Sequence, residues 1–240
     1  MSRTRDLTTG SLAQHFRHLA IPAAIGMVFT TLYNVVDVYF AGLLGTDEQA
    51  GLAISFQAFF LTITFGFGLA SALTALAGNA MGAKDAKEAQ LIAGRGIGFG
   101  VLISGILIVG AYFAGPELIK IVSVEGGYRD AGTRYFMLLL FSIPGFVLAF
   151  GMNGLLQSQG DTESMKRAQI GAFFANILLN PLLVFGVPGF VPGIGFDGIA
   201  ISTVICQSGV MLYVGYRLFQ TDLLAGWQWS SFAPSTDTYK

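Results

Sequence analysis

Six long apolar stretches, joined by short polar or glycine-rich segments, run through this sequence of 240 residues. A bilayer core about 30 Å thick is crossed by roughly 20 helical residues, so each stretch is predicted to be a transmembrane helix. Barrel strands alternate polar and apolar positions over about ten residues, and these stretches do not, so the predicted fold is all-α. The six predicted spans are Leu19–Leu44, Ala50–Ala77, Leu91–Ala114, Tyr135–Leu156, Ala168–Gly186 and Ile194–Tyr216.

Composition narrows the classes of function. Apolar residues make up 53% of the chain and charged residues 11%, whereas a soluble domain carries roughly 25% charge. The net charge of −1 provides no basic surface for nucleic acid. The sequence contains no H-E-x-x-H, G-x-S-x-G or P-loop motif. We therefore expect a multi-pass membrane protein that is not an enzyme and needs no cofactor.

The basic residues predict an orientation through the positive-inside rule. Ten of the 13 fall on one side of the predicted bundle, namely Arg3, Arg5, Arg17, Lys84, Lys87, Arg95, Lys166, Arg167, Arg217 and Lys240. The other side receives Lys120, Arg129 and Arg134. Both termini are therefore predicted to be cytoplasmic, with the chain in the inner (plasma) membrane.

A G-x-G-x-x-G pattern occurs at Gly193, Gly195 and Gly198. After a strand and before a helix, such glycines bind a pyrophosphate. Here they lie between two apolar stretches of bilayer length, so we expect them to shape the start of the sixth helix instead.

Asp37 is the acidic residue that lies well inside a predicted span, with Val36 and Val38 beside it. Thr30, Tyr33 and Asn34 precede it at spacings that put all four on one stripe of a helix. A carboxylate in lipid costs at least about 2.5 to 3.5 kcal/mol, so it is expected to face protein or water and to mark an ion or substrate path. The alternative is a purely structural hydrogen bond to a neighbouring helix.

Uncharged polar side chains in three other spans are candidate partners of Asp37. Asn176 and Asn180 are four residues apart in the fifth span, and Thr203 and Gln207 repeat that spacing in the sixth. Asn153 is a further amide in the fourth span. Together with one carboxylate these oxygens suit a proton or a hard monovalent cation.

Several segments together resemble the multidrug and toxic compound extrusion (MATE) transporters. The most specific are LLQSQGDT at 155–162 and NILLNPLLVFG at 176–186. Others are Pro22, DVYFAG at 37–42, GNAMGAKDA at 78–86 and GIAIST at 198–203. The resemblance extends over essentially the whole chain, with Ile199 standing where the family has a small residue.

The resemblance implies an antiporter that exports organic cations and other amphipathic drugs against inward H⁺ or Na⁺. It implies an ion site at Tyr33, Asp37, Asn153, Asn176, Asn180 and Thr203, with Na⁺ held by Asp37, Asn176, Asn180 and Thr203 if sodium is the ion. Thr30, Asn34 and Gln207 are candidates for the substrate cavity. Some members have a second aspartate where this chain has Asn180, so a mechanism that needs two membrane carboxylates is not expected here.

Family members have two six-helix lobes, so this chain is expected to represent the amino-terminal lobe. The predicted divisions are a cytoplasmic segment (1–18), a six-helix bundle (19–220) and a polar tail or interlobe linker (221–240). Expected partners are membrane lipid, an amphipathic drug, and a second six-helix lobe or a second copy of the chain. Two alternatives stay open: a flippase for lipid-linked precursors, and a non-transporting module that binds lipid or a partner lobe.

Overall fold

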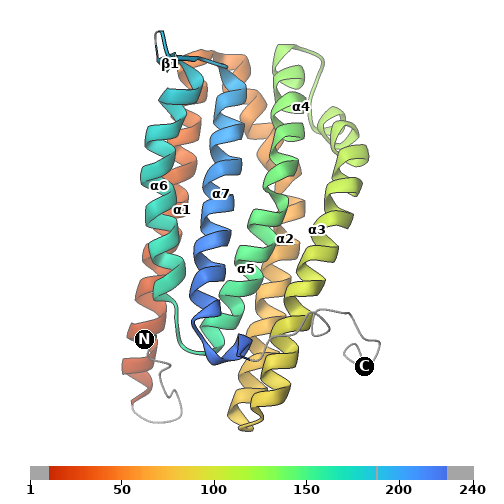
Figure 1. Ribbon diagram of the computed structural model, residues 1–240. Coiled ribbons are helices and arrows are strands. Elements are labelled where there is room, and N and C mark those ends of the chain that lie inside the picture. The colour runs from red at the N-terminus through yellow and green to blue at the C-terminus, as the bar shows by residue number, and fades with distance from the viewer. Residues whose placement is uncertain (1–10, 188, 226–240) are drawn as a thin grey trace.

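The computed structural model describes residues 11–187 and 189–225, and it confirms an all-α membrane fold (Figure 1). Six of its helical segments are long and apolar enough to cross a membrane. The long helices are α1 (Leu12–Leu44), α2 (Thr46–Gly82), α3 (Ala86–Val122), α4 (Gly127–Leu139), α5 (Ile143–Ser158), α6 (Glu163–Val184) and α7 (Phe196–Phe219). The short elements are the 3₁₀ turns η1 (Leu140–Ser142) and η2 (Asp222–Leu224) and the strands β1 (Gly186–Val187) and β2 (Val191–Pro192).

The helices extend beyond the predicted spans because polar residues on either side of each apolar run are helical too. α1 begins at Leu12, where the Ser11 hydroxyl caps it by accepting a hydrogen bond from the Gln14 N–H. At the other end of the described chain, Leu223 and Leu224 of η2 are buried against the bundle, although both fall in the predicted polar tail. The other parts of the predicted terminal segments, residues 1–10 and 226–240, lie outside the described residues.

The fourth span is a single helical rod, but a 3₁₀ turn interrupts it. Its two parts, α4 and α5, are joined by η1 and together run from Gly127 to Ser158. Pro144 is the second residue of α5. Its nitrogen carries no proton for a bond to the carbonyl four residues earlier, which favours a tighter turn at this point.

The three glycines around the start of α7 shape the entry to this helix, as expected. A Cβ on Gly193 would stand 2.5 Å from the carbonyl carbon of Phe185, and one on Gly198 would stand 2.7 Å from that of Leu183. Gly195 has a φ of 62°, a backbone conformation that residues with a Cβ rarely adopt. These three residues let the chain turn back from the β1–β2 hairpin and bring the start of α7 against the end of α6.

α7 holds the two sides of the bundle together. α1 packs against α6 on one side, and α2 packs against α3, α4 and α5 on the other. α7 lies between α6 and α5 and contacts both (Figure 1). The fully buried aromatic core lies where α2, α4 and the start of α7 meet, around Phe59, Tyr135 and Phe136.

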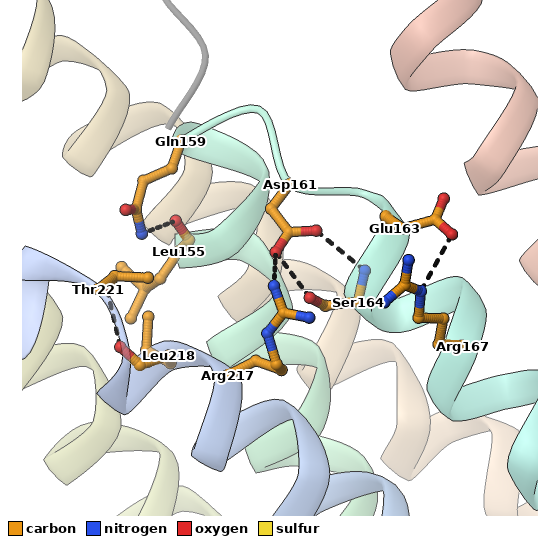
Figure 2. Close-up of polar contacts among 9 residues, drawn as sticks. All are labelled: Leu155, Gln159, Asp161, Glu163, Ser164, Arg167, Arg217, Leu218 and Thr221. Carbon is orange, nitrogen blue, oxygen red and sulfur yellow. Dashed lines mark hydrogen bonds and ion pairs between the residues drawn. The ribbon is translucent and has the colours of Figure 1, made fainter. Parts of the chain in front are cut away.

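An ion pair ties the start of α6 to α7 (Figure 2), at the end of the bundle opposite the β1–β2 hairpin (Figure 1). The carboxylate of Asp161, just before α6, accepts from the backbone N–H of Ser164 at 2.9 Å and from its hydroxyl at 2.6 Å. A guanidinium N–H of Arg217, near the end of α7, donates to the same carboxylate at 3.3 Å. Gly160, with a φ of 78°, makes the preceding turn. The LLQSQGDT segment is therefore a helix-capping and helix-joining motif in this fold.

Candidate functional site

The carboxylate of Asp37 is completely buried where α1, α6 and α7 meet. Its Oδ1 accepts two hydrogen bonds, each of 2.8 Å, from Nδ2 of Asn176 and Nδ2 of Asn180. The i, i+4 spacing places both amides on the same face of α6, toward α1. Among the described residues no cationic side chain pairs with Asp37, and these neutral donors compensate its charge, which removes much of the penalty for burying it.

The second carboxylate oxygen is approached from α7. The Thr203 hydroxyl donates to Oδ2 of Asp37 at 3.3 Å, and the Tyr33 hydroxyl donates to the Thr203 oxygen at 3.1 Å. Tyr33 and Asp37 are one turn apart in α1, and both are buried. We call Tyr33, Asp37, Asn176, Asn180 and Thr203 the carboxylate cluster.

The two amides of the cluster differ in how many of their hydrogen-bonding groups have a partner. Asn176 donates to Asp37, lies 3.5 Å from the Ser202 hydroxyl, and accepts from Asn180 at 3.3 Å. The Oδ1 of Asn180, by contrast, is buried and has no hydrogen-bond partner among the described residues. This oxygen is an acceptor held beside a carboxylate, with its capacity unused.

The cluster has neighbours that were not among the predicted site residues, Ser202 and Tyr135 among them. Ser202 contacts Asn176, and Tyr135 of α4 lies near enough to Asp37 and Thr203 to interact with them electrostatically. The Tyr135 hydroxyl is buried without a hydrogen-bond partner in the described structure. Tyr135 opens the predicted fourth span, so a tyrosine at the start of an apolar run was the available signal for it.

The structure places the other predicted site residues apart from this cluster. Asn153 and Thr30 line a separate cleft. Asn34 is exposed on the outer face of α1. Gln207 is buried beside Gly145 of α5, one turn along α7 from Thr203.

The cleft that contains Asn153 has a volume of about 730 Å³ and lies between α1 and α6 on one side and α2 and α5 on the other. Phe67 and Phe150 form an aromatic pair in its wall, with ring centroids 4.5 Å apart. The Oδ1 of Asn153 is buried and has no partner in the described structure. The polar lining residues are Thr30, Thr31, Ser71, Thr74, Asn153, Gln157, Thr162, Lys166 and Gln169.

The cluster and the cleft occupy opposite halves of the same two helices. The cleft uses residues 22–31 of α1 and 165–169 of α6, toward the end that carries the Asp161–Arg217 ion pair. The cluster uses residues 33–37 and 176–180, toward the β1–β2 hairpin. Along α1, Thr30 and Asp37 are seven residues apart, which corresponds to about 10 Å.

The donor set suits a proton or a monovalent cation better than a divalent metal. Within the described ranges there is no group of three His, Cys, Asp or Glu side chains placed to hold a metal ion. The cluster contains one carboxylate, and its other oxygens belong to amides and hydroxyls. A single negative charge with neutral oxygens balances a charge of +1.

Comparison with known proteins gives a family and several relatives. The MatE family profile matches residues 22–182. The probable multidrug resistance protein YoeA of Bacillus subtilis is 28% identical over 68% of this chain and 35% of its own length. The multidrug export protein MepA of Staphylococcus saprophyticus is 23% identical over 72% of this chain and 38% of MepA. A FAD transporter of Shewanella oneidensis is 23% identical over 76% of this chain and 40% of that protein.

Solved structures show the same fold. A crystal structure of MATE in complex with MaL6 superposes on 100% of this chain with a TM-score of 0.86 and 24% identity. The outward-facing conformation of a multidrug resistance MATE family transporter gives a TM-score of 0.84 over 96% of the chain, also at 24% identity. This chain corresponds to 52% and 50% of those two structures, so it spans about half their length.

Proposed function

Because this chain belongs to the MatE family of multidrug efflux transporters, we propose that it is the amino-terminal lobe of a cation-coupled multidrug antiporter. The buried carboxylate of Asp37, which accepts hydrogen bonds from two helices, is the observation that carries the proposal. In this account Asp37 binds and releases the coupling ion, which is H⁺ or Na⁺. The cleft between α1/α6 and α2/α5 receives the drug.

A turn of one amide is enough to change what the cluster binds. With Nδ2 of Asn180 facing Asp37, the cluster stabilises an ionised carboxylate. Rotating that amide by 180° puts its unused Oδ1 in the place of Nδ2. There it accepts the proton of a neutral carboxyl group or coordinates Na⁺ beside the carboxylate. Asn180 is therefore the proposed switch, and Asn176, whose amide is fully engaged, is the proposed anchor.

The cleft suits an amphipathic compound with an apolar aromatic body and hydrogen-bond donors. Phe67 and Phe150 provide the aromatic surface, and the unused Oδ1 of Asn153 provides an acceptor. Thr30, which we predicted to line the substrate cavity, is one of its lining residues. The names of the relatives include multidrug export proteins and a FAD transporter, so the substrate class rests on the chemistry of the cleft.

Ion and drug are coupled through α1 and α6, which carry both sites. Binding a cation at Asp37 changes the hydrogen bonds that hold α1 to α6. The same two helices form one wall of the cleft. Any difference in how the helices pack with and without the ion changes drug affinity, and by reciprocity drug binding changes ion affinity by the same factor.

The cleft does not favour the flippase alternative. A lipid-linked precursor with phosphate groups needs several available cationic side chains in the cavity. Lys166 is the ionisable residue in the lining, and its ammonium pairs with Glu163 at 2.7 Å. A non-transporting module is less favoured too, because a purely structural role does not explain the unused buried oxygens of Asn153 and Asn180.

We also propose an orientation and a partner for this lobe. With both termini cytoplasmic, the cleft lies in the cytoplasmic half of the bundle and the carboxylate cluster in the outer half. Ions then reach Asp37 from outside and drugs reach the cleft from inside. The second wall of the transport path is a second six-helix lobe or a second copy of this chain, because alternating access requires two bundles that rock around a site.

Ethidium fluorescence tests this function in the purified chain, reconstituted in lipid nanodiscs. Ethidium is titrated at several Na⁺ concentrations, with choline replacing sodium, and at several pH values without sodium. We expect the Kd for ethidium to rise with one of the two ions, and this ion dependence to disappear in Asp37→Asn.

The matched control is Asp130→Asn, which removes an exposed carboxylate of α4 outside both sites. It is expected to behave like the wild type. Equal ion dependence in Asp37→Asn and the wild type, or a wild type that binds no ethidium, contradicts the proposed function.

A further inference from the structure

The drug cleft has one ionisable side chain among its described lining residues, that of Lys166 in α6. The other polar residues of that lining carry neutral amides or hydroxyls, and none of the lining residues is acidic. The Lys166 side chain is only 19% exposed. A cation in such a partly buried site forms its strongest hydrogen bonds with an anionic partner. The cleft therefore favours an acidic group on the compound that it binds.

Lys166 shares its carboxylate partner with a second cation. Nζ of Lys166 lies 2.7 Å from Oε2 of Glu163, and Nε of Arg167 lies 3.2 Å from Oε1 of the same carboxylate. The Glu163 side chain is 42% exposed, so water weakens its attraction for Lys166. Lys166 can exchange Glu163 for another acid, because Arg167 still compensates the Glu163 charge. These three residues carry one net positive charge, which a single carboxylate neutralises.

The acidic residue nearest to Glu163 in the sequence, Asp161, is engaged elsewhere. Its Oδ1 accepts from the backbone N–H of Ser164, and its Oδ2 accepts from the Ser164 hydroxyl and from Arg217. On the facing helix α1, the stretch 22–31 that borders the cleft contains no charged residue. Glu163 is therefore the carboxylate with which a bound acid competes for Lys166.

The recognition features of the cleft follow one another along the bundle. Lys166 is three residues after Glu163, the first residue of α6, whereas Asn153 and Phe150 are five and eight residues before Ser158, the last residue of α5. At 1.5 Å per residue, these positions are about 4.5, 7.5 and 12 Å from the turn between the two helices. The ammonium is thus nearest the turn, the unpaired amide oxygen comes next, and the aromatic pair is farthest away.

We propose that the cleft prefers aromatic drugs that carry a carboxylate, with Lys166 as the binding residue for that group. The aromatic rings of such a compound lie against Phe67 and Phe150. An N–H or O–H group donates to Oδ1 of Asn153, and the carboxylate accepts from Nζ of Lys166, which exchanges Glu163 for the drug. The inference rests on the proposed function, because it names the substrate class of the same cleft.

Two dyes with the same aromatic body isolate the contribution of the acid. Rhodamine 110 carries a carboxylate, and its methyl ester lacks that charge. Fluorescence anisotropy measures the Kd of each dye for the full chain in phosphatidylcholine nanodiscs, with empty nanodiscs as background. One pH and one Na⁺ concentration are used throughout, so that ion binding at Asp37 is constant. The wild type is expected to bind the acid about fivefold more tightly than the ester.

Changes at the shared ion pair are expected to move this preference in opposite directions. Lys166→Gln should abolish the preference by weakening the binding of the acid about fivefold, without weakening that of the ester. Lys166→Arg should keep the preference. Glu163→Gln removes the competing carboxylate, so it should bind the acid more tightly than the wild type does. A folding defect does not produce such a gain.

Lys87→Gln is the matched control, because it removes a positive charge from an exposed position of α3 outside the lining of the cleft. It is expected to keep the wild-type preference. Three results overturn the inference. They are an unchanged preference in Lys166→Gln, an equal loss of preference in Lys87→Gln, which indicates diffuse charge, and no gain in affinity for the acid in Glu163→Gln.

The same dyes separate a failure of this inference from a failure of the proposed function. Both dyes can bind with an ion dependence that disappears in Asp37→Asn, while Lys166→Gln leaves the preference unchanged. In that case the carboxylate preference is wrong and the proposed function stands. A wild type that binds neither dye contradicts both.

Discussion

Asp37 of α1 and Asn176 of α6 are 139 positions apart in the chain, yet 2.8 Å separates the carboxylate oxygen of one from the amide nitrogen of the other. The contact crosses between the first and fifth spans and is closed on its other side by Thr203 of α7. It makes a buried charge the point at which three helices meet. Changes at this charge are therefore expected to alter the packing of the three helices and, under the proposed function, ion binding as well.

The two amides of α6 are expected to have separable effects. Asn176→Ala removes a donor to a buried carboxylate and the acceptor for Asn180, so it should lower the free energy of unfolding by about 1.5 to 3 kcal/mol. Asn180→Ala also removes one donor, but it eliminates an unpaired oxygen, so its cost in stability should be smaller. Ion affinity should fall more in Asn180→Ala, and less in either variant than in Asp37→Asn. Thermal unfolding and ion titration of both variants check this order, and a reversed order contradicts the proposed switch.

The Asp161–Arg217 ion pair is predicted to stabilise the bundle without taking part in ion coupling. Its side chains are only 13% and 19% exposed, and Nε of Arg217 is buried without a partner in the described structure. Asp161→Asn should lower the free energy of unfolding by about 1 to 3 kcal/mol. Glu163→Gln weakens the ion pairs with both Lys166 and Arg167, but the Glu163 side chain is 42% exposed, so the change should cost less than about 1 kcal/mol. Similar unfolding midpoints for the two variants would contradict the proposed role of this ion pair in joining α6 to α7.

The predicted orientation is testable with single cysteines. The native Cys206 is buried, so background labelling should be low. Lys120→Cys should react with an impermeant maleimide in intact cells, whereas Lys84→Cys should react only after the cells are opened. The opposite pattern means that the bundle is inverted, and the cleft would then face outward.

Hydropathy and the free-energy cost of burying a charge were enough to predict the membrane spans and the central residue of the candidate site. The six spans follow from apolar runs of bilayer length. Asp37 follows from its position inside one of them, and the i, i+4 spacing of Asn176 and Asn180 follows from the geometry of a helix. These features are local in sequence.

Packing decided the features that local reasoning missed. Thr30, Asn34 and Asp37 share a stripe by spacing, but α6 and α7 cover only part of it. Asn34 is about 100° around α1 from Tyr33 and is exposed, and Thr30 is two turns below Asp37, where α1 borders the cleft. Asn153 lines the cleft and is not part of the carboxylate cluster. The helix that carries it, α5, packs mainly against α2 and α7 and makes few contacts with α6. Such contacts between distant spans are not encoded in the spacing of residues along any one helix.

Transport is predicted to require a second bundle. In nanodiscs that each hold a single copy, the chain should bind ions and ethidium. In liposomes, a form shown by crosslinking to be monomeric should move no ethidium when an ion gradient is imposed. Activity restricted to a crosslinked dimer supports two copies as the two lobes. Robust ion-coupled transport by a monomer contradicts the need for a second wall.

The most direct test of the central claim measures ion-dependent stability at Asp37. A ligand that binds the folded state raises the unfolding temperature with its concentration. The wild type and Asp130→Asn should therefore unfold at higher temperature as Na⁺ replaces choline, or as the proton concentration rises in sodium-free buffer. Asp37→Asn should fold but lose that difference for the coupling ion. An Asp37→Asn protein that keeps the same ion-dependent rise as the wild type would contradict the assignment of Asp37 as the coupling residue.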